Sequence, residues 1–345
     1  MAELYLEDEV FGNLLPFIRD EQITDINYNG SALWVDHLVR GRYQVPSYRA
    51  DSSFLNRFSM RIANLMNRSF NQYEPLLEAE TDELRISIIH ESVTNTGRSI
   101  SIRKTPGVRR LNRERMLATS YCTEELDIFM ANAVRAGFTL AVAGLPGAGK
   151  TEYLKAMTAY IPPARKVITV EDNLEIRYRL INPGKDCIEI KVGDTFSYSR
   201  AIKASMRQLP GWLILSEARS VEVQYLLETM STGISCMTTI HTDDVRKIPD
   251  RFCSMMGKDV TNEVYSFLDF GILVGCYNMP EKGICRRIEQ AALFDRNEGE
   301  NRMIVFYQDG KMVRPRLSET MQRKFAFAGI SDPFCETEDR VLCTG

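Results

Sequence analysis

The spacing of apolar residues in the first hundred positions predicts a small α/β domain. Apolar side chains at 53–68 recur every three or four residues, which indicates an amphipathic helix, and those at 4–19 follow the same period. Short apolar stretches bounded by turn-forming residues such as Asn29-Gly30-Ser31 indicate strands. The expected strands are 23–27, 32–36, 83–90 and 98–103.

From about Met116 onwards, helical spacing alternates with continuous apolar runs that indicate buried strands. Helices are expected at 123–135, 152–160, 197–208, 221–230 and shortly after Lys247. Strands are expected at 138–143, 166–170, 212–216, 236–240, 270–276 and 288–293. This alternation implies βαβ units, in which parallel strands form one sheet and the connecting helices cover its faces.

Residues 105–115 differ from both regions and are expected to be an interdomain linker. Pro106 and Gly107 interrupt regular structure, and basic residues outnumber the one acid, Glu114. A basic linker can contact a nucleotide, a lipid or a nucleic acid, but a solvated linker is the simpler interpretation. The domains expected around it are 1–104 and 116–330, followed by an irregular tail at 331–345 that carries Cys335 and Cys343.

Composition narrows the class of protein. The 345 residues are 44% hydrophobic and 26% charged, with a net charge of −3, so nothing global favours a nucleic-acid or anionic-membrane partner. No apolar run approaches the roughly 20 residues that span a bilayer, and the acidic N-terminus is unlike a signal peptide, so we expect a cytoplasmic protein. The eight cysteines form no Cys-x-x-Cys pair, which favours reduced thiols over a zinc cluster.

The segment 144–151, Gly-Leu-Pro-Gly-Ala-Gly-Lys-Thr, fits the phosphate-binding P-loop pattern and lies between a predicted strand and a predicted helix. Glycines let the backbone approach phosphate oxygens, and the N-terminus of the following helix directs free N–H groups at them. Lys150 would contact the β- and γ-phosphates of ATP, and the Thr151 hydroxyl would hold Mg²⁺. The residues expected to bind nucleotide are Gly144, Gly147, Ala148, Gly149, Lys150, Thr151 and Glu152. A glycine-rich turn with a chance lysine is the alternative, and the strand-turn-helix order favours the phosphate site.

The fold class expected is therefore α/β. We predict a small N-terminal α/β domain joined to a RecA-like P-loop NTPase core with a mostly parallel sheet and helices on both faces.

Polar side chains at the ends of three further predicted strands are candidates for catalysis. Glu217 follows the apolar run 212–216, and the ends of parallel strands meet at the edge where ligands bind, so Glu217 is the candidate for polarising water. Glu171 and Glu175 follow the strand 166–170, and His241 follows 236–240 as a candidate γ-phosphate sensor. The alternatives are a surface salt bridge for Glu217, helix capping for the two other acids and a structural role for His241.

The order and spacing of these elements resemble the secretion ATPases of the type II/type IV superfamily, especially the branch of the tight-adherence pilus motor and the VirB11-like conjugation ATPases. The similarity covers residues 20–295. The matching segments are the Walker A box 144–151, an acidic box 167–175, a Walker B segment 206–219 with Glu222 after it, and a histidine box 232–241.

The resemblance implies an ATPase that uses ATP and Mg²⁺, with Thr151, Glu171 and Glu217 as metal ligands. It implies that arginines of the N-terminal domain contact the nucleotide, with Arg85 and Arg103 the first candidates and Arg98 behind them. It also implies a homo-hexameric ring, bound peripherally to the inner face of the cell membrane through an inner-membrane platform protein. The zinc-binding insertion of some relatives is absent from the sequence.

Departures from the family pattern keep three hypotheses open. Gly211 stands where the family usually has aspartate, Ser216 where it has glycine and Ile234 where it has histidine, and the P-loop carries Leu145-Pro146. The main charged groups are present, so the leading hypothesis is an ATPase motor hinged at the linker. A nucleotide-gated scaffold that hydrolyses ATP weakly is the second hypothesis. A nucleic-acid motor is the third, but no basic, aromatic-interleaved stripe supports it, and no direct nucleic-acid binding is expected.

Overall fold

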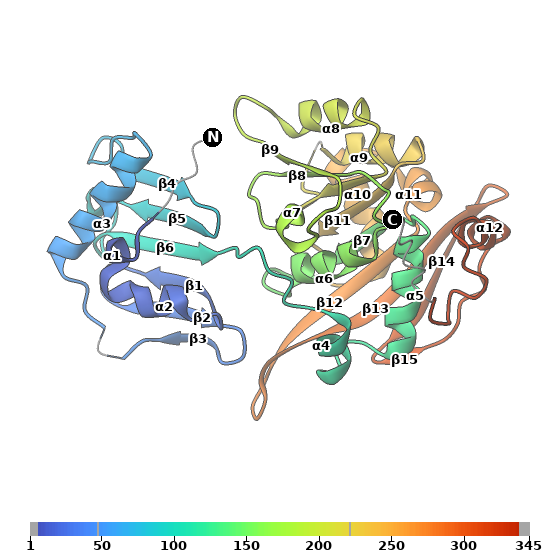
Figure 1. Cartoon of the computed structure of the whole chain (residues 1–345), viewed down its shortest axis with the longest axis horizontal. Coiled ribbons are helices and arrows are strands. Elements are labelled where there is room, and N and C mark those ends of the chain that lie inside the picture. Colours follow the sequence, from blue (N-terminus) through green and yellow to red (C-terminus); the bar gives the residue numbers. More distant parts are fainter. Residues whose placement is uncertain (1–5, 47, 221, 338–345) are drawn as a thin grey trace. The chain divides into compact units, whose positions relative to one another are not determined.

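The structure is a computed structural model that describes residues 6–46, 48–220 and 222–337. The chain divides into two compact units, and each is described by itself (Figure 1). Unit 1 comprises residues 1–107 together with 277–285, and unit 2 comprises residues 108–276 and 286–345. The first residue of the helix expected at 221–230, Val221, and the tail cysteine Cys343 lie outside the described residues.

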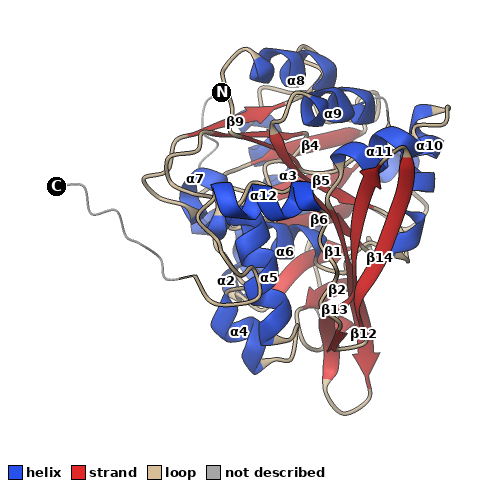
Figure 2. Ribbon diagram, turned by 90° about the vertical axis from the view of Figure 1, so that its right-hand side faces the viewer, coloured by secondary structure: helices blue, strands red, loops and turns tan. Residues whose placement is uncertain are grey.

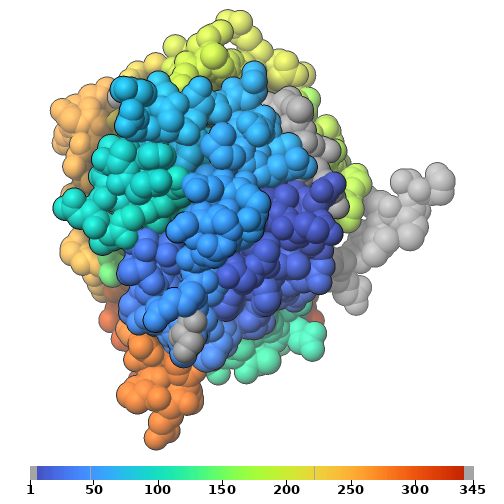
Figure 3. Space-filling view, turned by 90° about the vertical axis from the view of Figure 1, so that its left-hand side faces the viewer, coloured from blue at the N-terminus to red at the C-terminus, as the bar shows by residue number. Residues whose placement is uncertain are grey.

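Unit 1 is a six-stranded antiparallel sheet with strand order β3-β2-β1-β6-β5-β4. Its strands are β1 (Ile23–Tyr28), β2 (Leu33–His37), β3 (Gly41–Gln44), β4 (Leu76–Glu80), β5 (Leu84–Ile89) and β6 (Ser99–Lys104). Its helices are α1 (Asp8–Phe11), α2 (Leu15–Arg19) and α3 (Ser52–Leu65), with a 3₁₀ turn at Gly12–Leu14. Figure 3 shows one face of this unit, on which its blue and teal segments lie side by side.

Helix α3 shows why the periodic stretch at 53–68 is helical. Asp51 caps its N-terminus by accepting a hydrogen bond from Ser53 N, and its apolar stripe, including Phe58 and Ile62, is buried in the core of unit 1. Residues 4 and 5 of the helix expected over 4–19 lie outside the described residues. Over the described part a single helix is wrong, because Gly12 adopts a φ of +48° and divides the segment into α1 and α2.

Unit 2 is built on a nine-stranded sheet with the order β15-β14-β13-β12-β7-β11-β10-β8-β9. The strands from β12 to β9 in this order are parallel, whereas β13, β14 and β15 pair in antiparallel fashion. The parallel strands are β7 (Leu140–Ala143), β8 (Val167–Glu171), β9 (Cys187–Lys191), β10 (Trp212–Leu215), β11 (Ser235–Ile240) and β12 (Phe270–Met279). The antiparallel strands are β13 (Gly283–Asn297), β14 (Glu300–Gln308) and β15 (Lys311–Met312), and Figure 2 shows β12, β13 and β14 as long neighbouring ribbons.

Helices cover both faces of this sheet. Alternate residues of β7 belong to different cores, since Leu140 and Val142 pack with α5 and α6 whereas Ala141 and Ala143 pack with α8 to α11. The helices are α4 (Arg113–Ala118), α5 (Glu124–Arg135), α6 (Lys150–Met157), α7 (Tyr178–Ile181), α8 (Tyr198–Met206), α9 (Glu222–Ser231), α10 (Ile248–Met256), α11 (Thr261–Phe267) and α12 (Glu319–Phe327). The expected α/β class, with a mostly parallel sheet between helical layers, is confirmed.

The C-terminal region is more ordered than its sequence indicates. The predicted strand 288–293 is the middle of the longer β13, and β14, β15 and α12 have no counterpart among the predicted elements. Beyond α12, the ring of Phe334 stacks on Phe129 of α5 with centroids 4.8 Å apart, and Asn132 Nδ2 donates to Pro333 O at 3.0 Å. The segment that ends at residue 337 is therefore part of the core of unit 2. Among the described residues, no helix has the length and apolar character needed to cross a membrane.

Candidate functional site

The P-loop lies between the end of β7 and the start of α6. All four residues of β7 are buried, and the loop that follows turns through glycines with positive φ, at 154° for Gly144, 77° for Gly147 and 95° for Gly149. A Cβ on Gly144 would lie 2.6 Å from Val274 O, so a side chain does not fit there. The sequence therefore has glycine where the backbone turns through positive φ and where Gly144 lies against the carbonyl of Val274. The loop leads into the N-terminus of α6.

Lys150 is held inside this loop. Its side chain is nearly buried, and Nζ donates to Gly144 O at 3.0 Å and Leu145 O at 3.2 Å. Burial lowers the pKa of Lys150 to about 8, while the nearby charges of Glu217 and Glu175 oppose that shift. A phosphate placed in the loop would therefore meet the positive charge of Lys150, which the nearby carboxylates balance only in part.

Three side chains from different elements meet at the P-loop. His241 Nδ1 lies 3.2 Å from Lys150 Nζ, and His241 Nε2 lies 3.0 Å from Glu217 Oε1. Burial lowers the pKa of His241, and the charge of Lys150 lowers it further, while Glu217 acts in the opposite direction. A neutral imidazole with its proton on Nε2 satisfies both contacts, because Nδ1 then accepts from Lys150 and Nε2 donates to Glu217.

Glu217 is oriented from its other side by Arg219. Arg219 Nη2 donates to Glu217 Oε2 at 2.8 Å, and Nη1 donates to Asp172 Oδ2 at 2.8 Å. The hydrogen bond to Glu217 raises the pKa of Arg219, which is opposed by partial burial. The result is a continuous chain of polar contacts from Lys150 through His241, Glu217 and Arg219 to Asp172.

The sheet order explains this grouping. Strands β7, β11, β10 and β8 are neighbours and parallel, so their carboxyl ends lie at one edge. Gly144, His241, Glu217 and Asp172 each follow one of these strands. The structure thus brings together Lys150, Glu217 and His241 as a cluster, while their chemical roles stay predictions.

Glu171 is placed differently from the expected metal ligand. Its side chain is fully buried, and Oε2 accepts from the backbone N–H of Glu175 at 2.9 Å and of Ile176 at 3.0 Å. Burial raises the pKa of Glu171 to about 8, against the effect of these two hydrogen bonds. Oε1 is also buried and has no hydrogen-bond partner among the described residues. In this structure the carboxyl group holds the loop after β8, and its predicted catalytic and metal-binding roles stay untested.

Of the remaining candidates in unit 2, Glu175 is half-buried in the loop after β8, and the others lie on the P-loop helix or just before it. Ala148 is buried, Thr151 is half-buried in the first turn of α6, and Glu152 Oε1 pairs with the buried Lys155 at 3.5 Å. Glu152 Oε2 is buried without a hydrogen-bond partner among the described residues. The hydroxyl of Thr151 and the carboxylate of Glu217 offer oxygen ligands, the kind that Mg²⁺ prefers, while in this structure His241 and Arg219 contact the two oxygens of Glu217.

The arginine candidates belong to unit 1. Arg85 and Arg103 are register partners on β5 and β6, and the mostly exposed Arg103 donates to Asp25 Oδ1 at 2.8 Å. Arg98 is buried, and its guanidinium forms a two-point contact with Glu91 at 2.7 and 2.8 Å and also donates to Leu55 O. Arg98 therefore stabilises unit 1, whereas contact of Arg85 and Arg103 with a nucleotide stays a prediction.

Two arginines at the site were not chosen as candidates from the sequence. Arg219 carries a usable signal, because it follows Glu217 by two residues just after a strand end. Arg286, on β13, donates from Nε to Gly147 O of the P-loop at 3.3 Å. That contact joins residues 139 positions apart, so local sequence reasoning has no signal for it.

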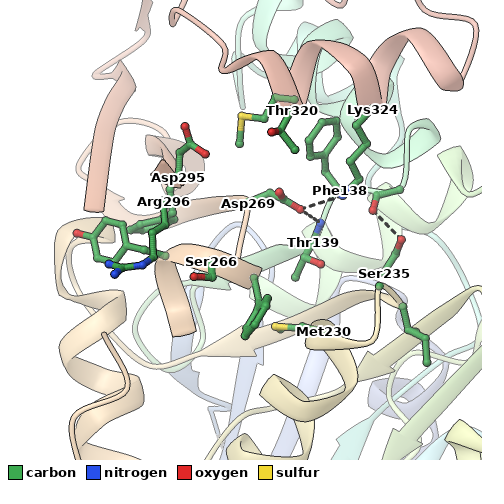
Figure 4. Close-up of a pocket in the computed structure, with 17 residues that line it drawn as sticks. Phe138, Thr139, Met230, Ser235, Ser266, Asp269, Asp295, Arg296, Thr320 and Lys324 are labelled. Atoms are coloured by element: carbon green, nitrogen blue, oxygen red, sulfur yellow. Dashed lines mark hydrogen bonds and ion pairs between the residues drawn. The ribbon is translucent and has the colours of Figure 1, made fainter. Parts of the chain in front are cut away.

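A cavity of about 250 Å³ lies at the opposite ends of the strands, near the start of β7 (Figure 4). Its polar groups already serve the fold, because Asp269 Oδ2 accepts from Thr139 N at 2.7 Å and from Lys324 Nζ at 3.2 Å. Ser235 Oγ donates to Gly137 O at 2.6 Å. These contacts tie α12 and β11 to the segment that leads into β7, away from the P-loop.

Comparison with known proteins agrees with this architecture. Residues 76–270, more than half of the chain, match the family described as Type II/IV secretion system protein. An uncharacterized protein of Bacillus anthracis is 24% identical over 98% of this chain and 81% of its own length. The type IV secretion system protein PtlH of Bordetella pertussis is 30% identical over 116 residues, which cover 32% of this chain and 33% of PtlH.

A solved structure shows the same fold at low sequence identity. The ATPase DotB of Yersinia pseudotuberculosis superposes with a TM-score of 0.64 and 14% identity, covering 84% of this chain and 80% of that one. Together with the family match, it confirms the resemblance inferred from the sequence boxes. The chain belongs to the type II/IV secretion system protein family and has the fold of a secretion-system ATPase.

Proposed function

We propose that this chain is an oligomeric motor that hydrolyses ATP to power protein secretion, pilus assembly or conjugative transfer at the inner face of the cell membrane. The observation that carries the proposal is the contact chain of Lys150, His241 and Glu217 at the mouth of a glycine-turned P-loop. Such a chain links the phosphate-binding lysine to a carboxylate that can orient water.

The residues present fit a nucleoside triphosphate with Mg²⁺. Positive-φ glycines leave room for phosphate oxygens, and Lys150 can exchange its two carbonyl acceptors for them. The hydroxyl of Thr151 and the carboxylate of Glu217 would hold Mg²⁺. The metal, when bound, neutralises charge on the phosphates during transfer to water.

The chain's own residues supply the remaining chemistry. Arg219 fixes Oε2 of Glu217 and His241 contacts Oε1, whose second lone pair can orient a water molecule and accept its proton. The neutral His241 keeps Glu217 and Lys150 connected while adding no charge of its own. Arg85 and Arg103 would complete the site, supplied by unit 1 of the same protomer or of a neighbouring one. The proposed assembly is a ring of six identical chains.

The proposed partner is an inner-membrane platform protein, which would hold the motor peripherally at the membrane. A weakly hydrolysing scaffold is the second candidate function, favoured by Ser216 and Gly211 in the Walker B segment. The two functions differ in whether Glu217-dependent phosphate release occurs.

The test measures phosphate release from ATP and Mg²⁺ across a protein concentration series. Glu217→Gln should lower turnover by about 10²-fold or more while binding of ADP without Mg²⁺ is retained, because the P-loop and Lys150, and not this carboxylate, would hold the phosphates. Glu228→Gln, an exposed position on α9, is the matched control and should have no effect. Equal rates for wild type and Glu217→Gln at every concentration would refute the motor and leave the scaffold.

Replacing the histidine gives an independent prediction. His241→Asn should lower kcat by about tenfold with little change in KM, because the link between Lys150 and Glu217 is lost. The pKa of His241 lies below its ordinary value of 6.5. The wild-type rate should therefore stay constant as the pH is lowered to 6.5. At lower pH the rate should decrease, because protonated His241 adds a second positive charge beside Lys150. A pH–rate profile of His241→Asn that keeps the acid limb would contradict this assignment.

A further inference from the structure

The C-terminal end of the P-loop helix is fastened by long polar side chains. Helix α6 ends at Met157 and continues into a 3₁₀ turn at Thr158–Tyr160. Lys185 Nζ donates to Ala159 O at 2.9 Å and to Ile161 O at 2.7 Å. Cationic donors suit this position, because the last carbonyls of a helix lack partners within it.

Arg109, from the predicted linker, holds the same helix end. Its Nε donates to Lys155 O at 3.2 Å, and its Nη2 donates to Ile181 O at 2.9 Å and Asn182 Oδ1 at 2.8 Å. Asn182 Nδ2 in turn donates to Thr158 Oγ1 at 3.1 Å. The simple expectation of a solvated linker therefore fails at Arg109, whose guanidinium joins the linker to α6 and to the end of α7.

The opposite end of α6 carries the phosphate-binding residues. The helix runs from Lys150 to Met157, a length of about 12 Å at 1.5 Å per residue. Most of its side chains are buried, including Tyr153 and Leu154. A short helix packed in this way moves as one body, so a displacement at Lys150 and Thr151 reaches the carbonyl of Lys155.

A second segment from the nucleotide edge reaches the same guanidinium. The buried Glu171 holds the loop after β8 through Glu175 N and Ile176 N, and this loop leads directly into α7. Helix α7 ends at Ile181, whose carbonyl accepts from Arg109. Movements of the P-loop helix and of the loop after β8 therefore converge on one linker side chain.

Only residues 105–108 separate Arg109 from the end of β6. We propose that Arg109 is a positioning residue that couples the linker to the nucleotide site, so that the linker follows α6 when nucleotide binds. The proposal rests on the proposed function, since it requires nucleotide at the P-loop. Arg109 itself would contact no nucleotide, and its role is to transmit a shift of α6 into the chain that leads to unit 1.

The test is amide hydrogen exchange of the full-length protein with and without ADP, measured on peptides covering 144–157 and 105–112. In the wild type, ADP should slow exchange in both peptides. In Arg109→Ala, the response of 144–157 should remain and that of 105–112 should be lost. Arg109→Lys should lose part of the linker response, because an ammonium group cannot reproduce the divergent hydrogen bonds of a guanidinium. This conservative variant provides the test if Arg109→Ala folds poorly.

Two controls separate coupling from general loosening. Lys258→Ala removes an exposed positive charge just after α10, outside the linker, and should leave both responses intact. Lys185→Met loosens the same helix end without touching the linker, so the 105–112 response should survive.

The outcomes distinguish failure of the inference from failure of the proposed function. A linker response that persists in Arg109→Ala, or that disappears equally in Lys185→Met, would overturn the coupling role. The coupling role would also be overturned if ADP slowed exchange in 144–157 of the wild type but left exchange in 105–112 unchanged. If 144–157 itself shows no response to ADP in the wild type, the nucleotide site of the proposed function has failed, and the coupling falls with it.

Discussion

The buried carboxyl group of Glu171 makes the stability of unit 2 depend on pH in a direction that can be stated beforehand. Burial raises the pKa of Glu171 from 4.5 to about 8 in the folded chain. Between these two values the unfolded chain has lost the proton while the folded chain keeps it. The stabilising contribution of this group is therefore fully present below about pH 4.5 and is lost as the pH rises to about 8.

The size of the effect follows from the pKa difference. Each pH unit in this interval changes the free energy of unfolding by about 1.4 kcal/mol, so the total between pH 5 and pH 8 is about 3 to 4 kcal/mol. Glu171→Gln removes the titration and keeps an oxygen that accepts from Glu175 N and Ile176 N. A constant offset of about 1–3 kcal/mol is expected from the amide group that replaces the unpartnered Oε1.

The assay is urea unfolding at half-unit steps from pH 5 to pH 8, followed by tryptophan fluorescence. The chain has two tryptophans, and Trp212 is buried on β10 of unit 2, so a Trp34→Phe background isolates the unit that contains Glu171. The difference in unfolding free energy between Glu171→Gln and its parent should shift steadily in favour of the variant as the pH rises. Parallel pH dependences for the two proteins would refute the assignment of a neutral buried carboxyl group.

The same variant tests the catalytic role expected of Glu171. If the group is already uncharged at pH 7, Glu171→Gln should release phosphate at close to the parent rate, unlike Glu217→Gln. A loss as large as that of Glu217→Gln would mean that Glu171 ionises when nucleotide and Mg²⁺ bind, as the family resemblance implies.

Two further predictions use matched pairs of positions. Gly144→Ala should lower ADP affinity by about tenfold or more and reduce the Tm, because its Cβ would lie 2.6 Å from Val274 O, whereas Gly147→Ala has nothing within 4 Å and costs only about 1 kcal/mol for its φ of 77°. Isothermal titration with ADP and a thermal melt compare the two, and equal losses would contradict the steric reasoning. Arg98→Ala should destabilise unit 1 by about 2–3 kcal/mol, since it breaks several charged hydrogen bonds of a buried guanidinium. Arg103→Ala, at an exposed ion pair, should cost less than about 1 kcal/mol yet slow phosphate release if it reaches the nucleotide; the reverse ranking in urea unfolding would refute this division.

The nucleotide edge of the sheet was predictable because its strands are continuous apolar runs that each end in a polar residue. Parallel pairing then brings those ends to one edge, so the sequence predicts that Lys150, Glu217 and His241 lie at the same edge of the sheet, where the structure joins them in contact. What local sequence does not contain is the direction of a side chain after a strand ends. Glu171 ends β8 as Glu217 follows β10, yet its carboxyl group turns inward to the loop.

Of the features that were not predicted, the hairpin turns near the C-terminus have a recognisable sequence pattern, whereas two arginine contacts have none. Glu298-Gly299 and Asp309-Gly310 both adopt positive φ at two consecutive residues, which is the two-residue turn that joins β13, β14 and β15. An Asp-Gly pair between apolar stretches is a recognised hairpin signal and would have predicted the last of these turns. The contacts of Arg109 and Arg286 have no such signal, because they depend on carbonyl groups brought near by the whole fold.

The packing of Phe334 on Phe129 has a consequence for how the protein is made. In the sequence, the two phenylalanines are separated by more than half of the chain, and the hydrogen bond from Asn132 to Pro333 spans 201 positions. At a synthesis rate of about 5–20 residues per second, α5 leaves the ribosome roughly 10–40 s before its covering segment exists. During that interval an apolar helix face is open to the solvent, and unit 2 cannot complete its core. The nascent chain should therefore engage a holding chaperone between the emergence of α5 and release, and a stop codon placed before Phe334 should yield a chain that aggregates.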